Sequence, residues 1–593
     1  MRSRFTIVAL TVATLAWLPA SGAAEKSEDT PKLEVEFVGV EGSLLENVQA
    51  FSSLQRLSRS EELDAEMVGR LTQRAAGEAR TALRPFGYYA PRVETDLKQV
   101  AGRWHARVTI DPGRPVMLVE QQVELTGSGR DERFLKQVLA QSPLRSGERL
   151  SHLAYDQLKG ELLRTALGNG YLDAAFTRGD LLVDPATHTA RAYVTLDTGE
   201  RYRFGPTTIE QNVLREGLIK RYLRYREGDW YDAGALLRTQ FALDDSQYFS
   251  VVEVLPEERD RENWIAPIRI TAEPNRRQLY TIAAGYATDT RVRGTLGWEN
   301  RRVNKRGHRV RAQIRGSSIE ESIGLTYVIP WKDPALEKLA FELRGFNEQR
   351  ADVETTGTSL KVGLTEVLGN WQRVLSVTAE STRDEVTTVS GGSTLVDRTQ
   401  SKLLVPGISY ALLPPGFLGI NAIPRGFQVE LLGSTEALGS DTTFGRIVMR
   451  DELRYRLAGR WHVQLRGEIG ASSVGDFQEL PAQYRFFAGG DRSVRGYGYE
   501  ELSPVDAQGN RIGGRHLVTA SVELQRSLPR NFVAAVFVDG GNAVNNFGDR
   551  LEYSAGIGLR YRLPFLSIGL DVAQSISEPD RSPRFHLNFT PEL

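Results

Sequence analysis

The alternation of apolar and polar residues through the C-terminal half of this sequence constrains its fold more than any other feature. Leu559 and Tyr561, for example, alternate with Arg560 and Arg562. Because successive side chains of a β-strand point to opposite faces, this pattern predicts strands with one apolar and one polar face. Sixteen such segments, each about 10 residues long, can be placed within residues 278–590.

The dimensions of these segments favour membrane strands. A tilted transmembrane strand needs roughly 9–11 residues, and bacterial single-chain barrels have an even number of strands. Short turns alternate with long polar connections such as 383–400 and 475–514. A soluble β-sandwich, with its polar face toward water, is the alternative. Since every backbone group in lipid must be paired, membrane strands predict a closed, 16-stranded antiparallel transmembrane β-barrel over 277–593.

The N-terminus predicts export. Arg2 and Arg4 precede an uncharged, mostly apolar run over residues 5–18, which small residues follow at 20–24. These features are typical of a secretory signal peptide, which we place at 1–24. A membrane anchor is the alternative, but the run is too short to span a bilayer comfortably. The chain has no cysteine, which excludes disulfides, cysteine-ligated metals and thiol nucleophiles.

Three repeats of about 80 residues lie between these two regions. Each repeat begins with a short strand, continues with two helical stretches and closes with two strands. The second helical stretch runs into a tyrosine in every repeat, at Tyr88, Tyr171 and Tyr248. The pattern predicts three small α+β domains of order β-α-α-β-β. The expected boundaries are 32–114, 115–199 and 200–274.

Two features of the chain resemble known families. The order and spacing of the repeats resemble POTRA domains, the periplasmic polypeptide-transport-associated modules. Val494-Arg495-Gly496-Tyr497, inside the connection 475–514, is similar to the V/I-R-G-F/Y motif of the outer-membrane assembly superfamily that contains BamA. The longer run FFAGGDRSVRGYGYEEL, together with three repeats and the chain length, is specifically similar to the TamA family.

The resemblance implies a role for the motif arginine. In the superfamily this connection folds back into the lumen, and its arginine contacts acidic groups on the inner wall. A guanidinium cannot lose its proton, so a partly desolvated one needs fixed carboxylate partners. We expect Asp539 to be the first partner of Arg495 and Glu523 the second. Gly496 would allow close approach to the wall, and Tyr497 would pack beside it.

The resemblance also implies a function at the cell outer membrane, with the repeats in the periplasm. The TamA family assembles or translocates β-rich clients such as autotransporters, together with an inner-membrane-anchored TamB-like partner. We expect these partners and outer-membrane lipid. The barrel would act at its seam, where strand 278–288 meets strand 583–590. The seam residues singled out are Ala283, Ala284, Gly285, Phe585, Leu587 and Phe589.

Other functions remain as alternatives. A two-partner secretion transporter shares the barrel and the motif but usually has two POTRA domains. A passive channel would not need the repeats, and a barrel protease would need a catalytic constellation. The seven histidines are scattered, and no nucleotide-binding or hydrolase motif is visible. We expect no enzyme activity, cofactor or metal, and the net charge of −1 argues against nucleic-acid binding.

Overall fold

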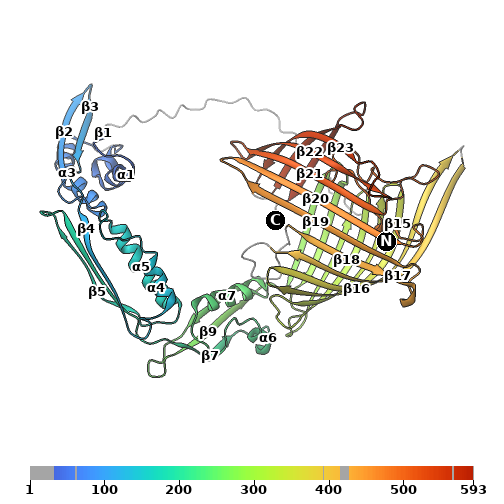
Figure 1. The fold of residues 1–593 in the computed structure, drawn as a ribbon, viewed down its shortest axis with the longest axis horizontal. Helices are drawn as coiled ribbons and strands as arrows, with labels where there is room; N and C mark the ends of the chain where they lie inside the picture. The colour runs from blue at the N-terminus through green and yellow to red at the C-terminus, as the bar shows by residue number, and fades with distance from the viewer. Residues whose placement is uncertain (1–32, 61–62, 391–392, 414–425, 564–565, 592–593) are drawn as a thin grey trace, which may run out of the picture. The chain divides into compact units, whose positions relative to one another are not determined.

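The computed structural model describes residues 33–60, 63–390, 393–413, 426–563 and 566–591 (Figure 1). They form two compact units, of which the first ends at Tyr202 and the second begins at Arg203. The expected signal peptide lies outside the described residues. None of the described helices combines the length and the apolar character needed to cross a membrane.

The first unit contains two α+β repeats. In both, the first strand pairs in parallel with the third, which pairs antiparallel with the second. The first repeat consists of β1 (Leu33–Val38), α1 (Gly42–Phe51), α2 (Ser53–Leu57), α3 (Ala65–Leu83), β2 (Arg92–Val100) and β3 (Arg103–Asp111). The second consists of β4 (Met117–Thr126), α4 (Arg133–Ala140), α5 (His152–Gly168), β5 (Ala175–Asp184) and β6 (Thr189–Asp197). Both repeats therefore have the predicted order, with the first helical stretch of the first repeat split in two.

Each repeat has its own apolar core between the helices and one face of the sheet. In the first repeat, Asp64 caps α3 by accepting a hydrogen bond from the Met67 backbone N–H at 2.6 Å. The apolar stripe of α3, which includes Val68 and Leu71, is buried against the sheet. On the opposite face of the first sheet, alternate side chains of β1 and β2 are exposed or half-buried.

The second unit contains the third repeat and the barrel. The repeat consists of β7 (Arg203–Glu210), α6 (Glu216–Lys220), α7 (Ala233–Asp245), β8 (Phe249–Pro256) and β9 (Ile265–Pro274). Its sheet has the order β7-β9-β8, with the third strand in the centre as in the two repeats of the first unit. The second helix again runs into its predicted tyrosine, and Tyr248 is buried.

Polar contacts attach the third repeat to two turns of the barrel. Arg224 forms a bidentate ion pair with Asp333, with Nη–Oδ distances of 2.6 and 3.2 Å. The Tyr248 hydroxyl donates to the carbonyl of Gly307. A Cβ at Gly307 would lie 2.9 Å from that hydroxyl, so the turn and the repeat fit closely. The third repeat is therefore fixed to the barrel by its own side chains.

We predict that Arg224→Ala loosens this attachment. The guanidinium is 22% and the carboxylate 26% exposed, so the pair is partly desolvated, and we expect its loss to cost about 1–3 kcal/mol. Hydrogen–deuterium exchange should increase in α7 and in the turn 331–337. Arg226→Ala, on an exposed neighbour, is the matched control. Equal exchange in both variants would mean that the Arg224–Asp333 ion pair does not fix the third repeat to the barrel.

The barrel is closed and has sixteen strands, each antiparallel to its neighbours. Its strands are β10 (Gln278–Ala287), β11 (Arg291–Asn300), β12 (Arg309–Gly316), β13 (Glu320–Pro330), β14 (Lys338–Arg350), β15 (Val353–Leu368), β16 (Trp371–Ser390), β17 (Ser393–Leu412), β18 (Gln428–Ser434), β19 (Phe444–Arg456), β20 (Trp461–Val474), β21 (His516–Ser527), β22 (Phe532–Val544), β23 (Glu552–Arg562), β24 (Leu566–Ser575) and β25 (Arg584–Pro591). The predicted fold class and strand number are confirmed.

The prediction of a long polar connection at 383–400 is wrong. Residues 383–390 extend β16 and residues 393–400 extend β17, and the two strands pair from Trp371–Leu412 to Ser390–Ser393. Twenty residues at about 3.3 Å each exceed the roughly 30 Å hydrocarbon core, so the hairpin projects beyond it. There, polar side chains can occupy both faces of a strand. The loss of alternation therefore marked the end of the lipid contact and not the end of the strand.

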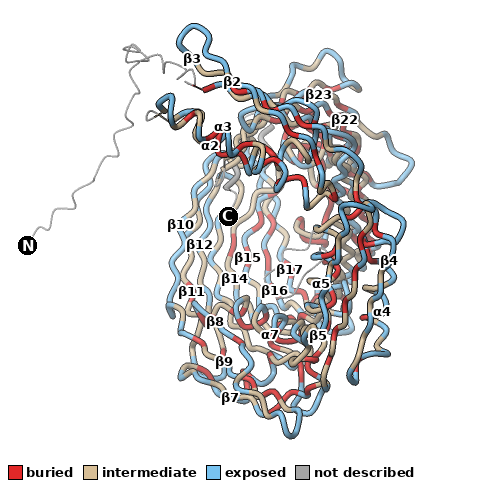
Figure 2. Tube along the Cα trace, turned by 90° about the vertical axis from the view of Figure 1, so that its left-hand side faces the viewer, coloured by how far each residue is buried: buried red, intermediate tan, exposed pale blue. Residues whose placement is uncertain are grey.

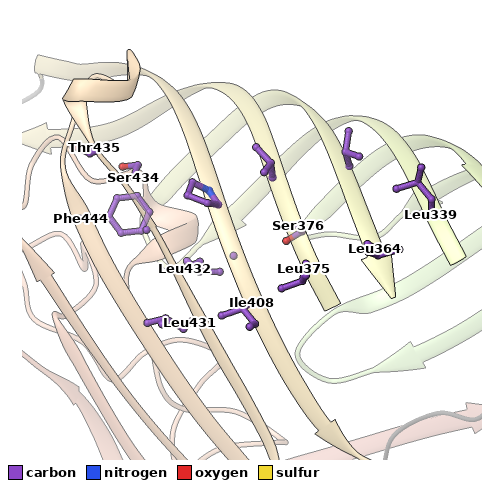
Figure 3. A pocket seen from close by; sticks show the side chains of 15 residues that line it. Leu339, Leu364, Leu375, Ser376, Ile408, Leu431, Leu432, Ser434, Thr435 and Phe444 are labelled. Atoms are coloured by element: carbon purple, nitrogen blue, oxygen red, sulfur yellow. The ribbon is translucent and has the colours of Figure 1, made fainter. Parts of the chain in front are cut away.

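The two faces of the barrel differ as the alternation predicts. Apolar side chains such as Ile282 and Ile557 are exposed on the outside, where lipid would cover them. Strands β14 to β19 also line a shallow apolar depression of about 720 Å³, with Leu375, Ile408 and Leu431 among its lining residues (Figure 3). Figure 2 shows mostly exposed and intermediate residues along β10 to β12 and more buried residues along β15 to β17.

Candidate functional site: the loop inside the barrel

Residues 475–514, here called the lumen loop, connect β20 to β21 and have a compact structure of their own. Backbone bridges join Phe486 to Gly514 and Ala488 to Leu502. Val494 and Tyr497 are fully buried in an apolar cluster that also includes side chains of the barrel wall. The loop therefore folds on itself and against the wall, which fixes the direction of the motif side chains.

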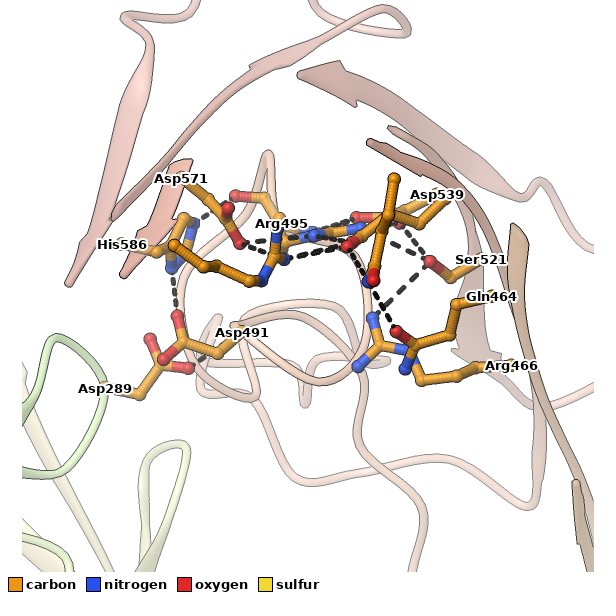
Figure 4. Close-up of polar contacts among 12 residues, drawn as sticks. Asp289, Gln464, Arg466, Asp491, Arg495, Ser521, Asp539, Asp571 and His586 are labelled. Atoms are coloured by element: carbon orange, nitrogen blue, oxygen red, sulfur yellow. Dashed lines mark hydrogen bonds and ion pairs between the residues drawn. The ribbon is translucent and has the colours of Figure 1, made fainter. Parts of the chain in front are cut away.

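Arg495 lies at the centre of a buried ionic network, with only 2% of its side chain exposed (Figure 4). Its Nε and Nη2 donate to the two oxygens of Asp539 at 2.7 and 2.8 Å. Its Nη1 donates to Glu523 at 2.8 Å and to Asp571 at 3.2 Å. The structure thus brings together both carboxylates expected from the sequence, on β22 and β21, and adds a third from β24.

Strand β23, between β22 and β24, supplies a second arginine to this network. Arg560 on β23 pairs with Glu523 at 2.9 Å and with Asp571 at 3.3 Å. Ser521 donates to Asp539 at 2.7 Å and thereby orients this carboxylate. Sequence reasoning missed Asp571, although it is the only acid in the apolar run of β24, a signal that could have found it.

The charge of Arg495 is well matched by this environment. Burial alone would lower the pKa of the guanidinium, but the hydrogen bond and charge of Asp539, followed by those of Glu523, raise its pKa above the usual value. The planar guanidinium donates to both oxygens of Asp539 and, through its third nitrogen, to Glu523. A lysine could not make these bonds with the same geometry. The ring of Phe537 covers the guanidinium, 3.2 Å from its carbon to the ring centroid.

The other motif residues bring the backbone close to the wall. A Cβ at Gly496 would lie 2.6 Å from the Cβ of Ser554, so a larger residue would push the loop away. The Tyr497 hydroxyl lies 2.9 Å from Glu552 and 2.9 Å from Ser575. Glycine and tyrosine therefore hold the backbone of the motif against β23 and β24.

The lumen loop also contacts the opposite wall. The backbone N–H of Ala482 donates to Asp384 on β16 at 2.7 Å. Glu500 accepts a hydrogen bond from the Arg350 side chain on β14 at 3.2 Å and another from the Ala351 backbone N–H at 3.1 Å. Sequence reasoning did not predict these contacts. The loop thus crosses the lumen and bonds to both sides of it.

The seam between β10 and β25 has less strand pairing than its neighbours. Among the residues that the structure describes, Ala287 and Asn588 are its only registered pair, whereas β10 and β11 pair over ten residues. The backbone N–H of Thr288 also donates to Leu587 at 3.1 Å, and Arg293 donates to the Phe589 carbonyl at 3.4 Å. Ala283, Ala284 and Gly285 have no registered partner on the described part of β25. Phe585 is exposed and faces outward.

Comparisons with known proteins agree with this architecture. The sequence model of the Omp85 superfamily domain matches residues 303–590, and that of the POTRA domain TamA domain 1 matches residues 34–112. The outer-membrane protein assembly factor BamA of Nitratidesulfovibrio vulgaris is 30% identical over 135 residues, which are 21% of this chain and 17% of that protein. The match therefore spans about a sixth of this BamA.

A solved structure shows the same fold. The crystal structure of BamA from Haemophilus ducreyi lacking POTRA domains 1–3 matches with a TM-score of 0.64 and 16% sequence identity. The match covers 80% of this chain and 99% of that one. Residues 303–590 thus match the Omp85 superfamily domain and residues 34–112 a TamA-type POTRA domain, which places the barrel in the outer membrane and the N-terminal repeats in the periplasm.

Proposed function

We propose that this protein assembles or translocates β-rich clients, such as autotransporters, at the outer membrane, as a TamA-like factor. The observation that carries the proposal is the combination of a lumen loop fixed through Arg495 and a seam with a single registered strand pair. A well-anchored loop keeps one side of the barrel rigid, and the weakly paired seam beside it is the place where the wall can open.

The seam offers backbone groups to a client. The first nine residues of β10 have partners on β11 but no registered partners on the described part of β25. Unpaired N–H and C=O groups of a strand edge bind another strand by completing the sheet. A client strand would pair with β10 in this way. Burial of its apolar face in lipid, rather than hydrolysis of a nucleotide, would drive assembly.

The three periplasmic repeats would receive the client or a TamB-like partner. In each sheet the third strand is central, so the first and second strands are edges. Such edges bind extended segments through main-chain hydrogen bonds. The three repeats also favour a TamA-like role over a two-partner secretion transporter. A passive channel fits less well, because the lumen loop crosses the interior and bonds to both walls.

Deletion of the gene provides the direct test of this function. We expect the outer membrane of the deletion strain to lose surface display of particular autotransporters or other barrels, and the gene supplied in trans to restore it. The purified protein should show low single-channel conductance, because the lumen loop obstructs the pore. An unchanged outer-membrane proteome together with a large steady conductance would instead support the passive channel.

A further inference from the structure

Three segments of the chain meet at one end of the seam. Asp289 lies in the turn between β10 and β11, Asp491 lies in the lumen loop, and His586 lies on β25 (Figure 4). One ligand atom from each lies within 4.8 Å of the others. They belong to the first strand pair, the loop and the last strand, so the group spans the seam that Ala287 and Asn588 mark.

Direct hydrogen bonds connect the three residues. The backbone N–H of Asp491 donates to the carboxylate of Asp289 at 2.7 Å. The Nδ1 of His586 bonds the carboxylate of Asp491, and its Nε2 lies 2.5 Å from the backbone carbonyl of Arg495. The His586 side chain is fully buried, so these bonds are shielded from water. Because both ring nitrogens are occupied by chain groups, the cluster is a hydrogen-bonded junction rather than a ready metal site.

We propose that the tip of the lumen loop at Asp491 is a latch across the seam. The loop tip holds Asp289 on one side and His586 on the other, and so joins the first strand pair to the last strand. Direct pairing of β10 and β25 supplies one registered pair and few further bonds at the same end. Thr288 and Leu587 exchange hydrogen bonds directly, and Arg293 donates to Phe589, so the loop adds a second, separate polar connection at this end of the seam.

The latch couples the position of the loop to the state of the seam. His586 bonds the backbone of Arg495 itself, so displacement of the motif from Asp539 would also withdraw Asp491 from the seam. Among the described residues, the other hydrogen bonds between the lumen loop and wall side chains reach β14 to β17 and β21 to β25, and only Asp491, through its backbone N–H, reaches the β10–β11 turn. Releasing this one residue separates the loop from the first strand pair. This role deepens the proposed assembly function, on which it rests.

Spin labels across the seam test the latch without any client. The chain has no cysteine, so Ile282→Cys and Phe585→Cys would be its only labelling sites, and both residues are exposed on the outside. In lipid vesicles, the long-distance population between the labels should rise about tenfold when Asp491→Ala is added. Asp491→Asn keeps a side-chain acceptor and should give a smaller rise. Arg492→Ala, on the exposed neighbour, should give none.

A double-mutant comparison completes the test. Asp289→Ala removes the acceptor of the Asp491 backbone N–H, and Asp491→Ala removes the side-chain bond to His586. Because these two contacts are in series, Asp289→Ala added to Asp491→Ala should widen the seam no further. Folding of each variant is checked by heat-modifiable migration on gels. An unchanged distance distribution in folded Asp491→Ala would overturn the latch, even if autotransporter display were lost. A widened seam in Asp491→Ala, together with normal display in the deletion strain, would support the latch and overturn the proposed function.

Discussion

Replacing Arg495 by alanine is expected to release the lumen loop and abolish client assembly. The substitution would leave three buried carboxylates, Asp539, Glu523 and Asp571, without this guanidinium. Arg560 would still pair with Glu523 and Asp571. Removing one partner of a buried ion pair costs about 3–5 kcal/mol, since the remaining charge stays out of water. We expect the loop to become sensitive to trypsin and autotransporter display to fall to the level of the deletion strain.

Two further variants separate charge from geometry. Arg495→Lys keeps the charge but not the planar fork, so it should rescue little activity. Adding Asp539→Asn to Arg495→Ala removes one of the unpaired carboxylates and should recover barrel stability without recovering loop protection or display. Arg492→Ala is the matched control, because it removes an exposed arginine three residues away. Full display by a folded Arg495→Ala protein would show that the network has only a structural role.

The strand pattern was predictable because lipid imposes it. Inside the hydrocarbon region every strand must present an apolar face, so the period of two is visible in the sequence. Outside that region the constraint ends, and the extension of β16 over 383–390 and of β17 over 393–400 was missed for that reason. The repeats were predictable from helical periodicity and from the tyrosine that follows each second helix.

The candidate site was predictable only in part. Arg495, Asp539 and Glu523 follow from the family motif and from the acids on neighbouring strands. Asp571 and His586 do not, because single polar residues in the β24 and β25 patterns carry no information about which loop residue reaches them. The extent of pairing at the seam depends on the register between β10 and β25. No local sequence pattern determines the register between strands about 300 residues apart in sequence.

Joining the seam covalently is expected to block client assembly while leaving the barrel folded. Ala287 and Asn588 are registered partners across β10 and β25, and directly opposed strand residues have the spacing that a disulfide requires. In a chain without other cysteines, Ala287→Cys with Asn588→Cys would therefore form a defined bond. Autotransporter display should fall to background under oxidising conditions and return when a reductant is added.

The control disulfide must stiffen the same strand without closing the seam. Ala283 and Thr295 are registered partners between β10 and β11, which stay paired in any model of an opening seam. Ala283→Cys with Thr295→Cys should support normal display whether oxidised or reduced. The comparison isolates separation of β10 from β25, because both bonds restrain β10 and only one restrains β25. Normal display with the seam fully crosslinked would mean that clients enter the membrane without passing between these strands.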